Sequence, residues 1–169
     1  QGTILMPLPI SVIVALVERR RGFFERFVLP MIRANEPAQI LVEGGEGWAA
    51  TKRNRGLAQS NQPLVAFCDD DTIVGADWLS KLYAALQQNP KAQFAYSNLA
   101  WITLPIPGAL PGSALCLRTG PFDEVSARAR KGNAVPIMSL WRREAFPGFD
   151  EKIYYYEDWD ATLTALERG

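Results

Sequence analysis

Short apolar segments alternate with amphipathic ones along the first hundred residues, and this alternation predicts an α/β fold. Apolar runs rich in β-branched residues predict buried strands at 11–17, 38–43, 63–68 and 92–99. Apolar residues at helical spacing predict helices over 20–35, 48–60 and 76–90. Pro30 should end or kink the first of these helices. Strands that alternate with helices indicate a largely parallel sheet with helices on its faces.

The second part of the chain has a less regular pattern. Residues 101–112 contain several Pro and Gly residues and predict a loop, whereas 114–117 predicts a short strand. Residues 134–146 predict a strand and a short helix, and a last helix should begin near Glu157. The chain contains no internal repeat and no clear linker, so we expect one domain over 1–169.

The composition excludes several classes of function. The chain has 169 residues with 18 basic and 18 acidic side chains, so its net charge of zero gives no field that would attract nucleic acid. It contains no histidine, which rules out Ser-His-Asp and Cys-His catalysis and any His-ligated zinc. Cys68 and Cys116 lie in apolar segments, and we expect both to be reduced and buried, as in a cytosolic protein. We expect no transmembrane segment, because the apolar runs are shorter than the about 20 residues that a spanning helix needs.

Three adjacent aspartates, Asp69, Asp70 and Asp71, directly follow the strand predicted over 63–68. Ligands of open α/β sheets bind beyond the carboxyl ends of the strands. Mg²⁺ prefers carboxylate oxygens and usually takes one or two carboxylates together with substrate phosphates, and such a cation would remove the repulsion among these side chains. The alternative is an Asp-rich turn that caps the next helix.

A second acidic pair, Glu157 and Asp158, lies at the predicted start of the last helix. The helix dipole favours carboxylates there, so capping is one interpretation. The tyrosines at 154–156 favour a pocket wall instead, and a carboxylate shielded by aromatic rings can have a raised pKa that suits a general base. Trp159 could stack on a sugar, although a helical Trp more often fills a core.

Basic residues gather in three places. Arg19–Arg21 form one run, and Lys52, Arg53 and Arg55 form another. Either run could be a solvated face or a ligand contact. Arg128, Arg130, Lys131 and Asn133 could clamp a phosphate or form a solvated polar strip.

Two sequence blocks resemble family-two glycosyltransferases with the GT-A fold. The first, "RNRGLAQSNQPLVAFCDDDTIVGADWL", has the family's Arg-Asn-x-Gly-Leu helix, apolar strand, Asp-x-Asp motif and Asp-Trp-Leu turn in order. The second, "GNAVPIMSLWRREAFPGFDEKIYYYEDWDATLTALERG", has Arg-Arg-Glu, Gly-Phe-Asp-Glu and Glu-Asp-Trp-Asp in order. The resemblance implies one GT-A-like (Rossmann-like) domain over 1–169. Its nucleotide-sugar-binding half would be 1–100 and its acceptor-side half 101–169.

The resemblance also implies an activity. Members of the family are metal-dependent inverting glycosyltransferases, so we expect Mn²⁺ or Mg²⁺ and a UDP-, GDP- or dTDP-linked sugar as donor. The acceptor would be a glycan, a lipid-linked molecule or a protein. We expect a cytoplasmic enzyme, which a lipid-linked acceptor would bring to the membrane surface.

Individual residues receive roles from the same resemblance. Asp158 would be the general base, with Glu157 beside it as the second catalytic carboxylate. Asp71 and Asp69 would bind the metal, and the acceptor would contact Trp159 and Tyr156. The donor-binding set would consist of Asp69, Asp70, Arg53, Glu43, Ala15 and Val17.

The sequence departs from the family pattern where the donor base is usually read. Val17 and Glu18 stand where the family has Tyr and Asn, and Glu43 with Gly44 stand where it has the base-reading Asp. Glu43 could still accept a hydrogen bond from a base N–H. This departure favours, as an alternative, a minimal or degenerate domain that binds a nucleotide, a sugar or a protein without catalysis. A nucleotidyltransferase fits less well, because "ALVERRRG" has only one glycine after the first strand.

Overall fold

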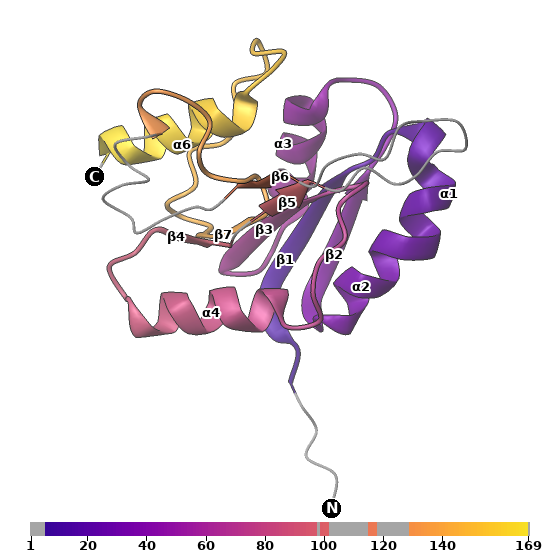
Figure 1. The fold of residues 1–169 in the computed structure, drawn as a ribbon, viewed down its shortest axis with the longest axis horizontal. Coiled ribbons are helices and arrows are strands. Elements are labelled where there is room, and N and C mark those ends of the chain that lie inside the picture. The colour runs from indigo at the N-terminus through magenta and orange to yellow at the C-terminus, as the bar shows by residue number, and fades with distance from the viewer. Residues whose placement is uncertain (1–5, 98, 102–114, 118–128, 169) are drawn as a thin grey trace, which may run out of the picture.

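The computed structural model describes residues 6–97, 99–101, 115–117 and 129–168, and its centre is a five-stranded sheet in the order β2-β1-β3-β7-β4 (Figure 1). The strands are β1 (Leu8–Ala15), β2 (Pro37–Glu43), β3 (Leu64–Asp69), β4 (Phe94–Tyr96) and β7 (Ser139–Arg142). Strand β1 pairs in parallel with β2 and β3, whereas β7 runs antiparallel to its neighbours β3 and β4. The α/β sheet expected from the sequence is confirmed, as a mixed sheet in which β7 opposes the other strands.

Helices cover both faces of the sheet, which explains why β1 is apolar from Val12 to Ala15 and β3 from Leu64 to Cys68. One face is covered by α1 (Arg21–Phe23), α2 (Leu29–Ala34) and α4 (Trp78–Gln88), and the other by α3 (Ala49–Gln59) and α6 (Glu157–Arg168). Successive β1 side chains point to opposite faces, so Val12 and Val14 join the first core and Ile13 joins the second. A strand buried on both faces cannot alternate apolar and polar residues, and its unbroken apolar run is the result.

The helical segment after β1 differs from its prediction. A 3₁₀ turn (Glu18–Arg20), α1, a π-helical turn (Phe24–Val28) and α2 follow one another without a break. Pro30 was expected to end or kink the helix; it does not end it, because the helical segment continues to Ala34, but the regular α-helical pattern is interrupted by the π turn just before Pro30. Pro30 lies in the first turn of α2, directly after the π turn, where its missing N–H breaks no regular α-helical hydrogen bond.

Two further segments differ from the sequence expectations. The strand predicted over 92–99 is divided into β4 and β5 (Leu99–Trp101), and β5 pairs antiparallel with β6 (Leu115–Leu117), near the short strand predicted there. The short helix expected after β7 is a turn, in which the N–H groups of Ala145 and Phe146 both donate to the carbonyl oxygen of Arg142. Pro147 and the left-handed Gly148 then redirect the chain, which buries Phe149.

Some sequence expectations fall on parts of the chain outside the described residues. They are the loop predicted over 101–112, except for Trp101, which belongs to β5, together with Arg128 and the side chain of Cys116. Cys68, by contrast, is a buried free thiol, as expected.

Helix α3 packs closely on β1, and Gly56 makes this approach possible. A Cβ atom built on Gly56 would lie 2.5 Å from Cγ2 of Ile13, which is closer than two carbon atoms can approach without rearrangement. Ile13 is fully buried in the middle of β1 and has no room to retreat. The glycine therefore sets the distance between the helix and the sheet.

We expect Gly56→Ala to lower the free energy of unfolding by about 1–3 kcal/mol, because the overpacking outweighs the gain in helix propensity. Gly22→Ala in α1 is the matched control, since nothing lies within 4 Å of the Cβ it would add. The control should be neutral or more stable by up to about 1 kcal/mol. Urea denaturation followed by circular dichroism measures both changes, and equal stability of the two variants would contradict the packing argument.

Candidate functional site

Predicted site residues from three separate segments meet at the carboxyl edge of the sheet. Ala15, the last residue of β1, is paired in register with Glu43 of β2 on one side and with Asp69 of β3 on the other. The N-terminus of α3 and the start of α6 lie at this same edge, together with the turn that follows β1 (Figure 1). The parallel arrangement of these three strands thus brings Ala15, Glu43 and Asp69 together, all of which were predicted as donor-binding residues.

The three aspartates after β3 have different surroundings. Asp70 is 1% exposed, and each of its carboxylate oxygens already accepts a hydrogen bond, one from the backbone N–H of Val17 and one from Arg20, both at 2.6 Å. Asp70, predicted as a donor-binding residue, therefore holds the turn that follows β1. The backbone N–H of Val17, a residue predicted to contact the donor, is already used in the hydrogen bond to Asp70.

Asp71 is the most accessible of the three acids. Its side chain is 49% exposed, and its Oδ2 accepts a hydrogen bond of 2.6 Å from the same Nη1 atom of Arg20. Partial burial raises the pKa of Asp71, and the charges of Asp69 and Asp70 add to this, although the guanidinium of Arg20 acts in the opposite direction. Arg20 therefore neutralises the exposed end of the acidic cluster.

Arg53 of α3 connects the two acidic motifs. It is only 5% exposed, and its Nη2 donates to Oδ1 of Asp69 at 2.7 Å while its Nη1 pairs with Oε1 of Glu157. Burial opposes the charge of the guanidinium, but the two carboxylates more than offset this, and the pKa of Arg53 is raised. Its Cζ lies 5.5 Å from the ring centroid of Phe149. The interpretation of Arg53 as a surface charge is wrong, and the residue that was expected to contact the donor is a buried link between Asp69 and Glu157.

Asn54, the next residue of α3, attaches the loop that precedes α6. Its side chain accepts a hydrogen bond from the N–H of Phe149 at 3.0 Å and donates to the carbonyl oxygen of the same residue at 2.9 Å. It also donates to Glu151, which accepts a further bond from Thr51. The loop is therefore fixed to α3 before it reaches Glu157.

Asp158 lies next to the Arg53 link in a partly shielded position. Its Oδ2 accepts a hydrogen bond of 2.9 Å from the side chain of Asn133, and its Oδ1 accepts the N–H of Trp159 at 2.9 Å. Burial raises the pKa of Asp158, the bond from Asn133 lowers it, and the charge of Glu157 raises it again, so that the net change is upward. Glu157 is engaged by Arg53, so a plain capping role does not account for this acidic pair.

The two residues predicted to contact the acceptor are adjacent, with ring centroids 6.0 Å apart. Trp159 is partly buried, and its Nε1 donates to the carbonyl oxygen of Ala129. Tyr156 is 63% exposed and has a φ of 67°, an unusual backbone conformation for a bulky residue. Trp159 thus has a structural hydrogen bond, whereas the side chain of Tyr156 remains open to a ligand.

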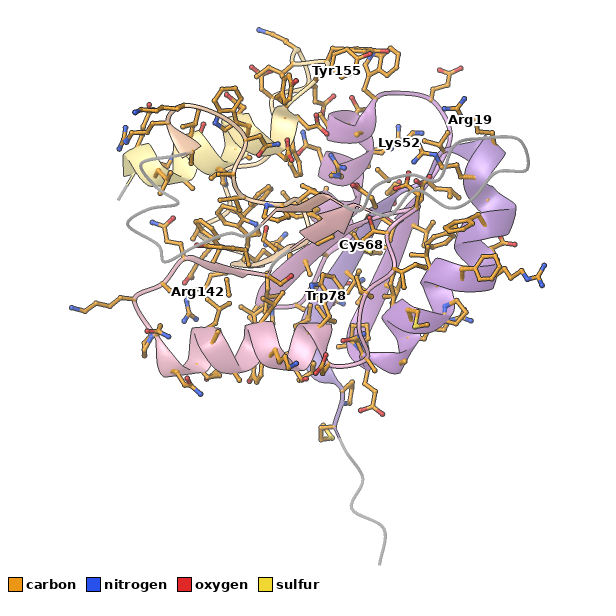
Figure 2. All side chains as sticks on the ribbon, viewed as in Figure 1. Arg19, Lys52, Cys68, Trp78, Arg142 and Tyr155 are labelled. Atoms are coloured by element: carbon orange, nitrogen blue, oxygen red, sulfur yellow. The ribbon has the colours of Figure 1, made fainter. Side chains whose placement is uncertain are left out.

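Glu43 and Lys52 complete this edge of the sheet. The carboxylate of Glu43 accepts a hydrogen bond of 2.7 Å from Gln59 and lies 3.5 Å from Nε of Arg55, so α3 holds it. Lys52 is 8% exposed, and its Nζ donates to the carbonyl oxygen of Leu16 just beyond β1 (Figure 2). The predicted base contact of Glu43 would compete with these partners.

Three contributors were not assigned to the site from the sequence: Arg20, Lys52 and Asn133. Arg20 and Lys52 belong to the basic runs already noted, but nothing in the sequence distinguishes them from exposed members of the same runs such as Arg19 and Arg55. Asn133 appeared only as a candidate for phosphate binding. Their partners are between 25 and 51 residues away along the chain.

The carboxylates at this edge can be compared with the needs of a hard divalent cation. Among the described residues, no group of three or more Cys, Asp or Glu side chains is arranged to hold a metal ion. Asp69 and Asp71 each use one oxygen for an arginine, and in the described part of the chain no side chain takes the other oxygen. Two carboxylates are enough for Mg²⁺ when substrate phosphates supply further ligands, so this pair fits a cation that arrives with a diphosphate.

We expect Arg53→Met to lower the free energy of unfolding by up to about 3–5 kcal/mol, because it leaves the partly buried carboxylates of Asp69 and Glu157 without their partner. Arg55→Met, which removes a partly exposed ion pair from the same helix, should cost less than about 1 kcal/mol. Chemical denaturation of both variants measures the difference. Similar stabilities would show that Arg53 does not hold the two motifs together.

The chain is similar to known proteins in sequence over part of its length and in fold over most of it. Residues 31–104 match the family model described as glycosyl transferase family 2, a range that contains the Arg53 helix and all three aspartates. No curated protein matches the chain in sequence. In the described part of the chain, no helix is long and apolar enough to cross a membrane.

Two solved structures of S. aureus TarS, residues 1–349, one alone and one in complex with UDP, are similar to the chain with a TM-score of 0.55 and 16% identity. In both cases the similarity covers 94% of this chain and 55% of the TarS chain, so the present chain spans about half the length of that structure. Residues 31–104 therefore carry the sequence pattern of glycosyl transferase family 2, on a sheet with the GT-A fold, which confirms the resemblance inferred from the sequence.

Proposed function

We propose that this chain is the catalytic domain of a metal-dependent inverting glycosyltransferase that uses a nucleotide-sugar donor. The observation that carries the proposal is the link through Arg53, which joins Asp69 of the first motif to Glu157 of the second. A donor bound at the three aspartates would therefore lie beside Asp158. The match to the family and the UDP complex of TarS support a nucleoside diphosphate as the leaving group.

The donor would bind along the carboxyl ends of β1, β2 and β3. We assign the ribose contact to Asp69, because Asp70 already uses both carboxylate oxygens within the protein. Asp71, with Asp69, would hold Mn²⁺ or Mg²⁺, which would neutralise the negative charge that develops on the departing diphosphate. Arg20 would have to release Asp71 for this, and the exposure of that carboxylate makes such an exchange feasible.

Asp158 would act as the general base of the transfer. The oxygen of an acceptor hydroxyl attacks the anomeric carbon from the face opposite the diphosphate, and Asp158 accepts the hydroxyl proton. The bond between the anomeric carbon and the diphosphate oxygen breaks, and the diphosphate leaves with the electron pair. The raised pKa of Asp158 suits this role, because a more basic carboxylate accepts a proton more readily. Glu157 and Arg53 would keep Asp158 in position.

A binding domain without catalysis is the second candidate function. It is favoured by Val17, which lacks a ring that could pack on a base, and by Glu43, whose carboxylate is engaged by α3. The shielded position of Asp158 opposes it, because a domain that only binds ligands has no need of a base there.

We expect UDP with Mn²⁺ to raise the melting temperature, because a ligand that binds only the native state stabilises it. At a hundred times its Kd the ligand adds about 2.7 kcal/mol, and each kcal/mol raises the melting temperature by roughly 2–4 °C for a domain of this size. Asp71→Asn should remove most of this shift, whereas Asp77→Asn, which alters an exposed carboxylate on the next turn, should keep it. A panel of UDP, GDP and dTDP that produced no shift with or without Mn²⁺ would contradict a nucleotide donor.

We expect Asp158→Asn to reduce sugar transfer by about 10²–10⁴-fold, the usual contribution of a general base, and to leave the UDP-induced thermal shift in place. In the unaltered protein kcat should fall as the pH is lowered, and the midpoint of this acid limb should lie above the ordinary aspartate pKa of about 3.9. Asn133→Ala removes the hydrogen bond that favours the carboxylate, so it should move this limb to higher pH. Steady-state kinetics across pH measures both effects. Full activity of Asp158→Asn, or an unmoved limb in Asn133→Ala, would show that another group takes the proton.

A further inference from the structure

Four exposed aromatic side chains gather where the N-terminus of α3 approaches the start of α6. They are Trp48, Tyr154, Tyr155 and Tyr156, each between 46% and 69% exposed, and together we call them the aromatic platform. Figure 2 shows Tyr155 projecting away from the body of the protein between these two helices. A single exposed aromatic residue is ordinary, but a contiguous group of this size usually marks a binding surface.

Three rings of the platform contact one another in a row, whereas the ring of Tyr156 contacts Trp159. The ring centroids of Trp48 and Tyr154 lie 4.0 Å apart, and those of Tyr154 and Tyr155 lie 4.3 Å apart, both in edge-to-face geometry. This arrangement is favourable for aromatic pairs, and Trp48, Tyr154 and Tyr155 remain about half or more exposed in it. Ring faces held in this way lose little conformational freedom when a ligand covers them.

The platform also has a rigid base. The loop before it is attached to α3 through Thr51 and Asn54, which both donate to the carboxylate of Glu151, at 2.9 and 3.0 Å. Asn54 further binds both backbone groups of Phe149, whose ring lies in the core. The three tyrosines therefore continue from an anchored loop, and Trp48 directly precedes the helix that anchors it.

The platform leads directly to the proposed catalytic base. Tyr156 is held at a φ of 67°, in the left-handed region, immediately before Glu157 and Asp158. A bulky residue rarely adopts this conformation, and such strain concentrates at functional sites. The Cα atom of Tyr155 can be at most roughly 11 Å from that of Asp158, because the two are three Cα–Cα steps apart along the chain. A ligand that covers the platform would therefore reach Asp158 after a few sugar units.

We propose that the aromatic platform is a subsite for the acceptor, and that the acceptor is a carbohydrate chain. The C–H face of a sugar ring packs on the electron-rich face of an aromatic ring, while the tyrosine hydroxyls and the indole N–H offer hydrogen bonds to its hydroxyl groups. A membrane surface fits less well, because peripheral binding to a bilayer combines apolar or aromatic residues with a strongly basic face. Lys152 is the one basic residue between positions 150 and 156, and Asp150 and Glu151 beside it offset its charge. This inference rests on the proposed glycosyltransferase function and narrows its acceptor to a glycan.

The test measures binding of the full chain to a printed array of oligosaccharides, with no donor present. We expect the unaltered protein to bind at least one glycan, and we expect Trp48→Ala and Tyr155→Ala to weaken that binding about tenfold. Phe27→Ala is the matched control, because it removes a comparably exposed aromatic ring from the helical segment after β1. Circular dichroism of each variant shows that it is folded. Failure of the unaltered protein to bind any glycan, or equal binding by all the variants, would overturn the proposal.

Two further measurements separate this proposal from its alternatives. Sedimentation with vesicles of phosphatidylcholine and phosphatidylglycerol should leave the protein in solution, and co-sedimentation that depends on Trp48 would overturn the proposal in favour of a membrane surface. The thermal shift with UDP and Mn²⁺ should be the same in Trp48→Ala as in the unaltered protein. Glycan binding without any nucleotide-induced shift would contradict the transferase function and leave the glycan subsite standing.

Discussion

A single buried cation, the guanidinium of Arg53, determines how the two halves of the site are arranged. A charge that is 5% exposed is costly to bury unless partners compensate for the lost water, and Arg53 finds one carboxylate at the end of β3 and another at the start of α6. These partners are separated by 88 residues, the difference between positions 69 and 157. The need to neutralise one charge therefore places the last helix of the chain against the end of β3.

The helix that carries Arg53 uses each residue of its Arg-Asn-x-Gly-Leu pattern in a different way. Gly56 removes the side chain that would keep α3 away from Ile13, and Asn54 binds the loop that leads to α6. Leu57 packs against the core on that face of the sheet. The pattern therefore combines three requirements of this helix. Gly56 allows the close approach to the sheet, Arg53 directs a guanidinium to the strand ends, and Asn54 holds the distant loop. Substitution of any one of these residues affects the position of the others, because they lie on consecutive turns of one rigid element.

The repulsion among the three adjacent aspartates is reduced by arginines from two different helices. Arg53 pairs with Asp69, and one nitrogen of Arg20 lies between Asp70 and Asp71. The acids also differ in burial, because Asp70 is enclosed by the protein while Asp71 remains half-exposed. A carboxylate at the surface can exchange its arginine for a cation and a diphosphate, whereas an enclosed one cannot do so without disturbing the turn after β1. Three identical and adjacent residues therefore differ in their ability to bind a cation, because their surroundings differ.

The sequence by itself determined the elements whose signals are local: the apolar runs of β1 to β3, the amphipathic α3, α4 and α6, and the acids that follow β3 and begin α6. It also supported the family resemblance, because the order and spacing of motifs are properties of the chain. Only the tertiary structure decided which polar residues meet. It inserted β7 between β3 and β4, used a π turn to continue the helix through Pro30, enclosed Asp70, and brought Arg20 and Asn133 to acids far along the chain. The physical reason is that burial and pairing of charge depend on contacts between distant segments, which no local pattern of residues records.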